Sequence, residues 1–375
     1  MVSIDRCMDE LAAMSKRKTG PYYESRVAAH VASELNLMGI DWEIDEVGNI
    51  LARYDGPESA GKTPVALVAH MDHPAFEIVD PQGKQGRLLG NVNPEYFASP
   101  IRVLAYPAVP KSPIESEVGC PGVITGCRKV GGETLLDLHL EGDCPPLPAF
   151  GVWDFPDMDI RGDIVHLRAA DDPVGCAVIL TVLAEAKQRQ TSAKIVGVFT
   201  RAEEINFLGS IHIAETVGLP KDAVVVSLET SKAIPGAEIG AGPVIRTGDR
   251  RHSFDDDAES LLRVAAAQLQ KEDSAFRSQR QLMNGGTCEG SLYVISGYRT
   301  TAMALPLGNY HNMSPETILS PEYISVSDMA AEVEILLRAS ELNLDDCRKF
   351  EREQLLHGTE PELEKLRRLS YETRP

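Results

Sequence analysis

Long hydrophobic runs are missing from this sequence, and so are paired cysteines. The longest apolar stretch, CAVILTVLAEA at residues 176–186, is too short to span a bilayer. The N-terminal segment MVSIDRCMDELAAM is interrupted by charged residues, which is typical of an amphipathic helix and not of a signal peptide. The seven cysteines are scattered and form no CxxC pair, so they favour reduced thiols over a disulfide framework. We therefore expect a cytoplasmic protein.

An excess of positive charge is also missing. Lys and Arg number 37 against 56 Asp and Glu, which gives a formal net charge of −19. A chain this acidic repels phosphate backbones and anionic lipid surfaces, so we expect neither nucleic acid nor a membrane as a partner. Hydrophobic residues make up 43% of the chain and charged residues 25%, which indicates a globular protein with a proper core.

The order of strand-like and helix-like runs predicts the fold class. From residue 163 onward such runs alternate, beginning with DIVHLRAA and PVGCAVILTVLAEAKQ. This alternation predicts an α/β fold, with a mixed and mostly parallel sheet that carries helices on both faces. The pair Ser320-Pro321 predicts the start of a long helix over residues 322–343, with Ser320 as its cap.

The composition and periodicity of the chain change between about residues 83 and 162. This stretch has many Gly and Pro residues, short β-like runs such as TLLDLHLEG and no helical period, so it predicts a small β-rich insertion. A length of 375 residues also favours more than one domain. The expected division is residues 1–85 and 163–345 for the main α/β domain, 86–162 for the inserted β-rich domain, and 346–375 for a charged helical tail.

Metal-ligand types of residue follow several of the predicted strands. The carboxyl ends of the strands in an open α/β sheet share one edge, where ligands bind. So many carboxylates at one edge would repel one another strongly, and bound cations would relieve the repulsion. Two divalent ions about 3.5–4 Å apart would do so. The residues are His70 and Asp72, Asp171 and Asp172, Glu203 and Glu204, Glu229, and His311.

These motifs resemble those of the co-catalytic zinc exopeptidases, and most of all the tetrahedral, glutamyl-type aminopeptidase family. The matching segments, in the family's order, are AHMDHPAF, RAADDPVG, FTRAEEINFLGS, SLETSKA, GGTCEGS and YHNMSPE, and with the flanking helices they cover residues 22–342. The long insertion lies between His70 and Asp171, and the gap between Glu229 and His311 is short. That arrangement favours the tetrahedral aminopeptidases over related deacylases. The resemblance implies a zinc-exopeptidase-like fold and a metal-dependent hydrolase that removes N-terminal residues from short peptides.

The resemblance also implies a ligand set for two divalent ions. His70, Asp171 and Glu229 would hold one ion, while Asp171, Glu204 and His311 would hold the other, with Asp171 bridging them. Zinc is the expected metal, although cobalt or manganese would suit the same imidazole and carboxylate ligands.

The remaining residues of the motifs would have supporting or catalytic roles. Asp72 would accept a hydrogen bond from the second ring nitrogen of His70 and fix its orientation. Glu203 would bind no metal and would instead act as the general base. The family also implies a cis peptide bond between Asp171 and Asp172.

Some features of the sequence leave alternatives open. The family usually has Asp where this chain has Glu229, and Glu there is commoner in deacylases and carboxypeptidases, which makes an amidohydrolase with the same dinuclear centre an alternative. A second alternative is a catalytically silent relative that serves as a scaffold. His73 could contact substrate, and Cys288 is more typical of a buried small residue than of a ligand. The family often forms large shells, so we expect a homo-oligomer.

Overall fold

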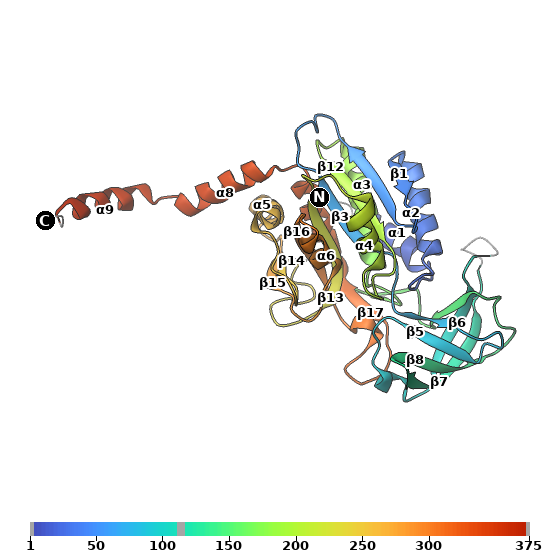
Figure 1. The fold of residues 1–375 in the computed structure, drawn as a ribbon. Coiled ribbons are helices and arrows are strands. Elements are labelled where there is room, and N and C mark those ends of the chain that lie inside the picture. The colour runs from blue at the N-terminus through green and yellow to red at the C-terminus, as the bar shows by residue number, and fades with distance from the viewer. Residues whose placement is uncertain (1–3, 111–116, 373–375) are drawn as a thin grey trace.

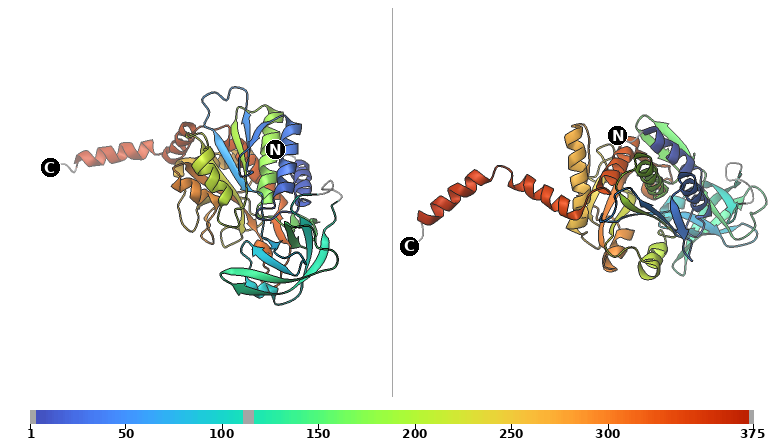
Figure 2. Two further views of the ribbon diagram at one scale, coloured as in Figure 1. Left: turned by 45° about the vertical axis from the view of Figure 1, so that its right-hand side comes forward. Right: turned by 90° about the horizontal axis from the view of Figure 1, so that it is seen from above.

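The computed structural model describes residues 4–110 and 117–372. Figure 1 shows a layered α/β body, a separate barrel of strands and a helical tail that extends away from the body. The body contains the candidate ligands, and the barrel lies against one end of it (Figure 2).

The body is built on an eight-stranded mixed sheet. Four neighbouring strands in its middle, β12, β3, β13 and β16, run parallel to one another. β2 and β14 flank them in the antiparallel direction. In sheet order the strands are β1 (Asp41–Ile44), β2 (Ile50–Asp55), β12 (Lys194–Thr200), β3 (Val65–His70), β13 (Val224–Lys232), β16 (Arg299–Leu307), β14 (Val244–Gly248) and β15 (Gln279–Leu282). The mixed, mostly parallel sheet predicted from the sequence is confirmed.

Helices cover both faces of this sheet, because the side chains of a strand alternate between the faces. In β3, Leu67 and Ala69 join the larger core, which contains residues of α1 (Ile4–Ser15), α2 (Ser25–Met38), α3 (Pro173–Arg189), α5 (Asp256–Glu272) and α7 (Val326–Ala339). Ala66 and Val68 join a smaller core on the other face, together with residues of the π-helix Ile213–Val217 and α6 (Glu289–Ile295). The short helix α4 (Leu208–His212) leads into that π-helix.

The β-rich insertion is a closed barrel with its own core of buried side chains, including Phe76, Ile124, Leu136 and Trp153. Its strands, in order around the barrel, are β4 (Ala75–Ile78), β5 (Gln85–Leu89), β8 (Glu133–Leu140), β7 (Cys120–Val130), β6 (Ile101–Pro107) and β9 (Ala149–Trp153), and a 3-10 helix, η1 (Pro94–Phe97), lies between β5 and β6. The division of the chain at residues 86 and 162 stays a prediction.

A three-stranded sheet connects the barrel to the body, and here one expectation from the sequence was wrong. The sheet consists of β10 (Met158–Arg161), β11 (Ile164–Leu167) and β17 (Glu322–Ser325). We expected residues 322–343 to form one helix capped by Ser320. Residues 322–325 instead pair antiparallel with β11. The helix α7 begins at Val326, where the Ser325 hydroxyl caps it by accepting the Asp328 N–H.

The tail after the body is helical, in α8 (Leu344–Leu356) and α9 (Glu360–Glu372). The start of α8 packs against α5 through the buried residues Leu344 and Cys347, and α9 extends away from the body (Figure 1). Within the described residues, every helix is too short or too polar to cross a membrane.

Candidate metal centre

The candidate ligands come from strand ends and from the loops that follow the strands. His70 is the last residue of β3 and pairs with Thr200 at the end of β12. Glu229 lies near the end of β13. Asp171 follows β11 and precedes α3, and His311 lies in the short 3-10 helix η4 (Tyr310–Asn312) after β16. The parallel strands therefore bring residues that are far apart in the sequence to one edge of the sheet.

The loop before α3, which contains Asp171, has two distinctive local features. The peptide bond between Asp171 and Asp172 is cis, as predicted from the motif. Asp172 caps α3 by accepting the Gly175 N–H at 3.3 Å, and Pro173 occupies the first turn, where its missing N–H costs nothing.

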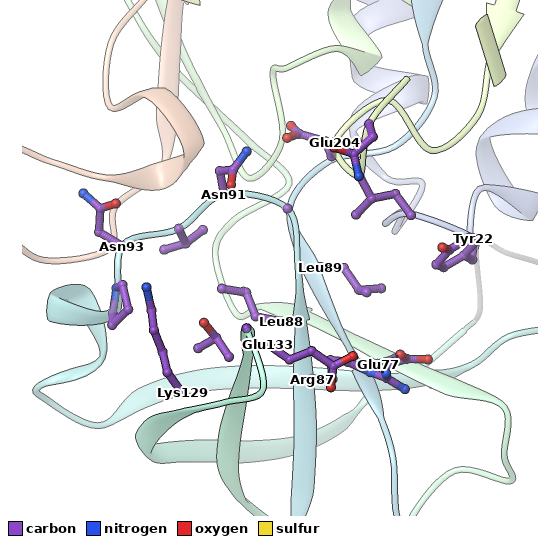
Figure 3. A pocket seen from close by; sticks show the side chains of 17 residues that line it. Tyr22, Glu77, Arg87, Leu88, Leu89, Asn91, Asn93, Lys129, Glu133 and Glu204 are labelled. Atoms are coloured by element: carbon purple, nitrogen blue, oxygen red, sulfur yellow. Dashed lines mark hydrogen bonds and ion pairs between the residues drawn. The ribbon is translucent and has the colours of Figure 1, made fainter. Parts of the chain in front are cut away.

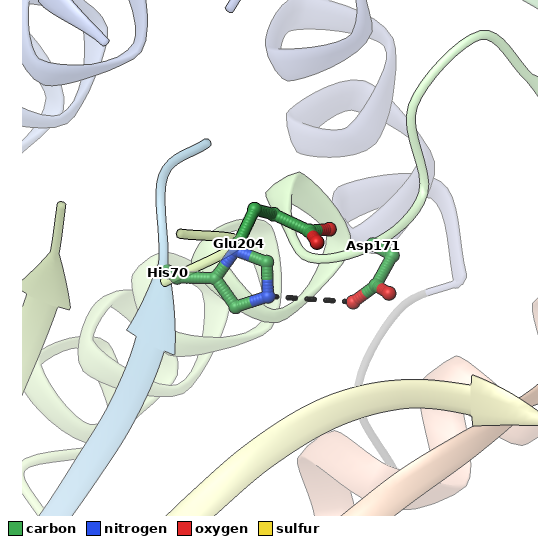
Figure 4. A group of neighbouring side chains, drawn as sticks. All are labelled: His70, Asp171 and Glu204. Atoms are coloured by element: carbon green, nitrogen blue, oxygen red, sulfur yellow. Dashed lines mark ion pairs between the residues drawn. The ribbon is translucent and has the colours of Figure 1, made fainter. Parts of the chain in front are cut away.

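Four of the predicted ligands converge on a small buried volume. His70 Nε2 lies 3.4 Å from Asp171 Oδ1, and His311 Nε2 lies 3.5 Å from Asp171 Oδ2. His311 Nε2 is also 3.3 Å from Glu204 Oε1. Figure 4 shows His70, Asp171 and Glu204 pointing toward one another, and one ligand atom from each lies within 4.8 Å of the others. The two oxygens of Asp171 thus face two different histidines.

The second ring nitrogens of these histidines set which nitrogen faces the centre. His70 Nδ1 donates to the carbonyl oxygen of Asp72 at 3.1 Å, and His311 Nδ1 donates to the carbonyl oxygen of Asn91 at 2.7 Å. Without a cation, the neighbouring carboxylates raise the pKa of His70 and of His311 despite burial. When a cation displaces the Nε2 proton, the ring keeps its proton on Nδ1 and Nε2 offers the lone pair that a metal ligand needs.

Several buried oxygens of the cluster accept no hydrogen bond from the residues that the structure describes. They are Asp171 Oδ1, Glu204 Oε1 and Glu229 Oε1, and their side chains are almost completely buried. An unsatisfied buried carboxylate is costly, and a cation held by Asp171, Glu204 and imidazole nitrogens would satisfy these oxygens. His70, Asp171 and Glu204 therefore fit a divalent ion, and Glu229 lies outside this group of three.

Burial and mutual repulsion shift the protonation of these acids. Burial raises the pKa of Glu229 to about 8, and the negative charge of Asp171 adds to the shift. Burial likewise raises the pKa of Glu203 well above its usual value, helped by Glu229 and Glu204. Burial opposes ionisation of Asp171 too, but the neighbouring imidazoles of His311 and His70 hold its pKa low. The cluster therefore suits a bound positive charge better than it suits water.

Asp72 and Glu24 anchor the loop that contains the two adjacent glutamates. The carboxylate of Asp72 accepts the N–H groups of Glu203 at 3.0 Å and Glu204 at 3.2 Å. It also lies 3.5 Å from His70 Nδ1, farther than the Asp72 carbonyl oxygen does. Glu24, which the sequence motifs do not indicate, accepts the Ala202 N–H at 3.0 Å. Glu203 Oε2 is left facing the cluster, 4.0 Å from His70 Nε2.

Two cavities open beside the cluster. The larger, about 790 Å³, lies next to Glu204 between the body and the barrel (Figure 3). Arg87 and Lys129 line it on the barrel side. The smaller, about 120 Å³, is lined by Glu229 together with Arg246, Cys288 and other residues.

Arg246 is a residue of this smaller cavity that the motifs do not reveal. Its side chain is buried, and its Nε has no hydrogen-bond partner in the described part of the chain. Its Nη1 makes a long 3.5 Å contact with Ser231 Oγ. Cys288 in the same cavity is also buried, which raises the pKa of its thiol to about 12 and makes it a poor ligand or nucleophile.

Comparisons with known proteins show what this chain is similar to. Residues 150–328 match the model of the M42 glutamyl aminopeptidase family. A candidate aminopeptidase of Acetivibrio thermocellus is 28% identical over 189 residues, which is 49% of this chain and 53% of that protein. The chain thus matches only about half the length of this curated relative.

Solved structures match over more of the chain. A TET aminopeptidase from a marine sediment archaeon of the Thaumarchaeota is 17% identical, with a TM-score of 0.73 over 92% of this chain and all of that one. The TET1 peptidase of Pyrococcus horikoshii, which assembles into a tetrahedron or an octahedral shell, is 18% identical, with a TM-score of 0.70 over 89% of this chain and 99% of that one. The resemblance derived from the motifs is confirmed: residues 150–328 match the M42 glutamyl aminopeptidases in sequence, and the chain has the fold of the tetrahedral aminopeptidases.

Proposed function

We propose that this protein hydrolyses peptide bonds in a metal-dependent reaction and removes N-terminal residues from short peptides. The observation that carries the proposal is the convergence of His70, Asp171, Glu204 and His311, with buried oxygens that accept no hydrogen bond. The match to the M42 family over residues 150–328 supports the same activity.

We assign the metal-binding roles as the sequence predicted them. His70, Asp171 and Glu229 would hold one divalent ion, and Asp171, Glu204 and His311 the other. One oxygen of Asp171 faces His70 and the other faces His311, which supports a bridging role for that carboxylate. Zinc is the metal we propose, because imidazole and carboxylate ligands suit it, with cobalt or manganese as substitutes.

The chain's own residues would then perform the proton transfers. Bound ions would withdraw electrons from the scissile carbonyl and make a coordinated water more acidic. Glu203, which faces the cluster and is anchored through its N–H by Asp72, would take the proton of the attacking water. The same carboxyl group would deliver that proton to the nitrogen of the leaving amine, so that the chain ends the cycle unchanged.

The two cavities suggest how a peptide would lie. The smaller one, beside Glu229, has room for one side chain at most, and the buried Arg246 would attract an acidic one. The larger one, beside Glu204, would hold the rest of the peptide. We therefore propose a preference for short peptides that begin with Asp or Glu.

We also propose a homo-oligomer in the cytoplasm. The structural relative from Pyrococcus horikoshii forms closed shells, which supports self-assembly here. All seven cysteines are free, in line with a reducing compartment.

A matched panel of substrates tests the proposed activity. Aminoacyl amides and short peptides with a free amine are compared with their N-acetylated forms, after loading with zinc, cobalt or manganese. We expect cleavage of the free-amine set, and its loss in Glu203→Gln. Cleavage of the acetylated set alone would identify the alternative deacylase. Metal binding without cleavage of either set would identify the scaffold relative.

A further inference from the structure

Glu322 is a completely buried carboxylate beside the candidate metal centre, and the sequence motifs do not indicate it. It is the first residue of β17, and it lies between the loop before α3 and the loop after β16. Its Oε2 accepts the N–H groups of Ala170 at 2.7 Å and Asp171 at 3.2 Å. Its Oε1 accepts the N–H of His311 at 2.7 Å. One carboxylate therefore binds the backbones of two candidate ligands.

These two ligands lie on separate loops, one before α3 and one after β16. Asp171 and His311 are 140 residues apart, and the atoms that face each other are 3.5 Å apart. The backbone around His311 is also unusual, because Asn309, His311 and Asn312 have φ values of 55°, 55° and 61°. Such left-handed conformations are unfavourable for residues other than glycine, so surrounding contacts must hold them. The hydrogen bond from the His311 N–H to Glu322 is one such contact.

His73 provides a second link between the loop of Asp171 and the loop of His311. Its Nδ1 donates to the carbonyl oxygen of Asp171 at 2.5 Å, and its Nε2 lies 3.0 Å from Asn312 Oδ1. Asn312 Nδ2 in turn donates to the carbonyl oxygen of Arg168 at 2.9 Å. Both ring nitrogens of His73 are thus engaged inside the protein, and the ring is buried, so a contact of His73 with substrate does not fit this geometry.

We propose that Glu322 is a positioning residue that sets the distance between Asp171 and His311 and thereby the affinity of the centre for a divalent ion. The inference rests on the proposed function, because it takes these two residues as ligands of one ion. Glu322 itself does not contact the ion or the substrate. It acts through the backbone N–H groups of Ala170, Asp171 and His311, which it accepts.

The test variant is Glu322→Gln, which keeps the shape of the side chain but replaces one acceptor oxygen with an amide that can only donate. Either the Asp171 loop or the His311 loop then loses its acceptor. Asp328→Asn is a matched control. Asp328 is equally buried, and its two oxygens accept the N–H groups of Gly240 and Gly242 at 2.7 Å each, away from the candidate ligands.

The readout is a titration of the metal-free full-length protein with Co²⁺, followed by the visible absorption bands of the ion and by calorimetry. We expect Glu322→Gln to weaken Co²⁺ affinity by about 10- to 100-fold, a usual cost of losing a residue that orients a ligand, and to change the band pattern. Asp328→Asn should bind Co²⁺ like the unchanged protein, even if both variants unfold at lower temperature.

Unchanged Co²⁺ affinity and spectrum in Glu322→Gln would overturn the inference, and so would an equal loss in Asp328→Asn. If Glu322→Gln does not fold, His73→Gln takes its place, with a smaller loss in affinity expected and an unchanged affinity overturning the inference. The titration needs no turnover. A protein that binds Co²⁺ but cleaves no peptide would therefore refute the proposed function while leaving the role of Glu322 open to this test.

Discussion

Two regions of this protein bury carboxylates whose oxygens accept no hydrogen bond, and they differ in what surrounds those oxygens. At the carboxyl end of the sheet, Asp171 and Glu204 converge with two histidines. In the helical layer, Glu332 on α7 is buried with an unsatisfied Oε1. Among the described residues, only His70, Asp171 and Glu204 bring three ligand atoms within 4.8 Å.

A buried carboxylate oxygen without a hydrogen bond can therefore belong either to a protonated acid or to a metal ligand, depending on its neighbours. A buried acid outside such a cluster can avoid its desolvation cost by keeping its proton, and burial, with a contribution from the negative charge of Asp328, raises the pKa of Glu332 to about 8. A convergent group of acids and imidazoles cannot relieve its repulsion so simply, and a cation is its natural complement. Four predictions test this comparison.

The largest effect is expected from Glu204→Ala. Removing a ligand of the cluster should lower metal content and reduce turnover by about a thousandfold or more, since a bound metal contributes several kcal/mol to such a reaction. Metal analysis and kcat/KM are measured together. Glu332→Gln is the comparison variant and should keep both. If Glu204→Ala keeps its turnover, the cluster is not the catalytic centre.

The second-largest effect is expected in how the free energy of unfolding depends on pH, through the protonation of Glu332. The folded-state pKa of about 8 lies above the unfolded value of about 4.3, so Glu332 destabilises the fold increasingly as the pH rises from about 4 to 8. Glu332→Gln should therefore be more stable than the unchanged protein by a few kcal/mol at pH 9 and by little at pH 4.5. Urea unfolding at both pH values measures this difference, with the exposed Glu353→Gln as a control. Equal gains at both pH values would contradict the assignment.

A smaller effect is expected when a metal is added to the metal-free protein. A ligand present at a hundred times its Kd stabilises the folded state by about 2.7 kcal/mol. Zinc should therefore raise the unfolding temperature of the unchanged protein and of Glu332→Gln. It should do so much less in Glu204→Ala. A shift of equal size in all three proteins would place zinc binding elsewhere.

The smallest effect concerns the cavity beside Glu229. Arg246→Met should lower kcat/KM for substrates that begin with Glu, relative to Leu, by about tenfold, since a charge-assisted hydrogen bond contributes about 1.5–3 kcal/mol. Lys232→Met is the matched control, because Lys232 lines the same cavity but is exposed to water. If the Glu to Leu ratio is unchanged in Arg246→Met, the buried guanidinium does not select the substrate.

The strand ends could be predicted from the sequence because apolar runs and the polar residues that follow them are both local patterns. His70, Asp171, Glu204 and His311 each come after such a run, and the parallel sheet brings these ends together. The aromatic-rich barrel was predicted only as a β-rich stretch, since closure of a barrel depends on pairing between strands far apart in the chain.

Other parts of the site could not be predicted, for identifiable reasons. Arg246 lies within β14, which runs antiparallel to β16, so it does not belong to the strand ends that motif reasoning inspects. Glu322 was assigned to a helix because Ser-Pro is a strong start signal, and pairing of residues 322–325 with β11 overrode it. The adjacent aromatic and β-branched residues Tyr323 and Ile324 are the local signal that would have favoured a strand.

The barrel is inserted in the chain between β3 and β11, so cleavage of a barrel loop by a protease would separate the candidate ligands into two fragments. β4 begins at Ala75, shortly after His70, and β11 ends at Leu167, shortly before Asp171. A single proteolytic cut in a barrel loop would therefore leave His70 and Asp72 on one fragment and every other candidate ligand on the second. Because β3 is hydrogen-bonded between β12 and β13, the two fragments would stay together, and a nicked protein would keep a complete centre assembled from two separate chains.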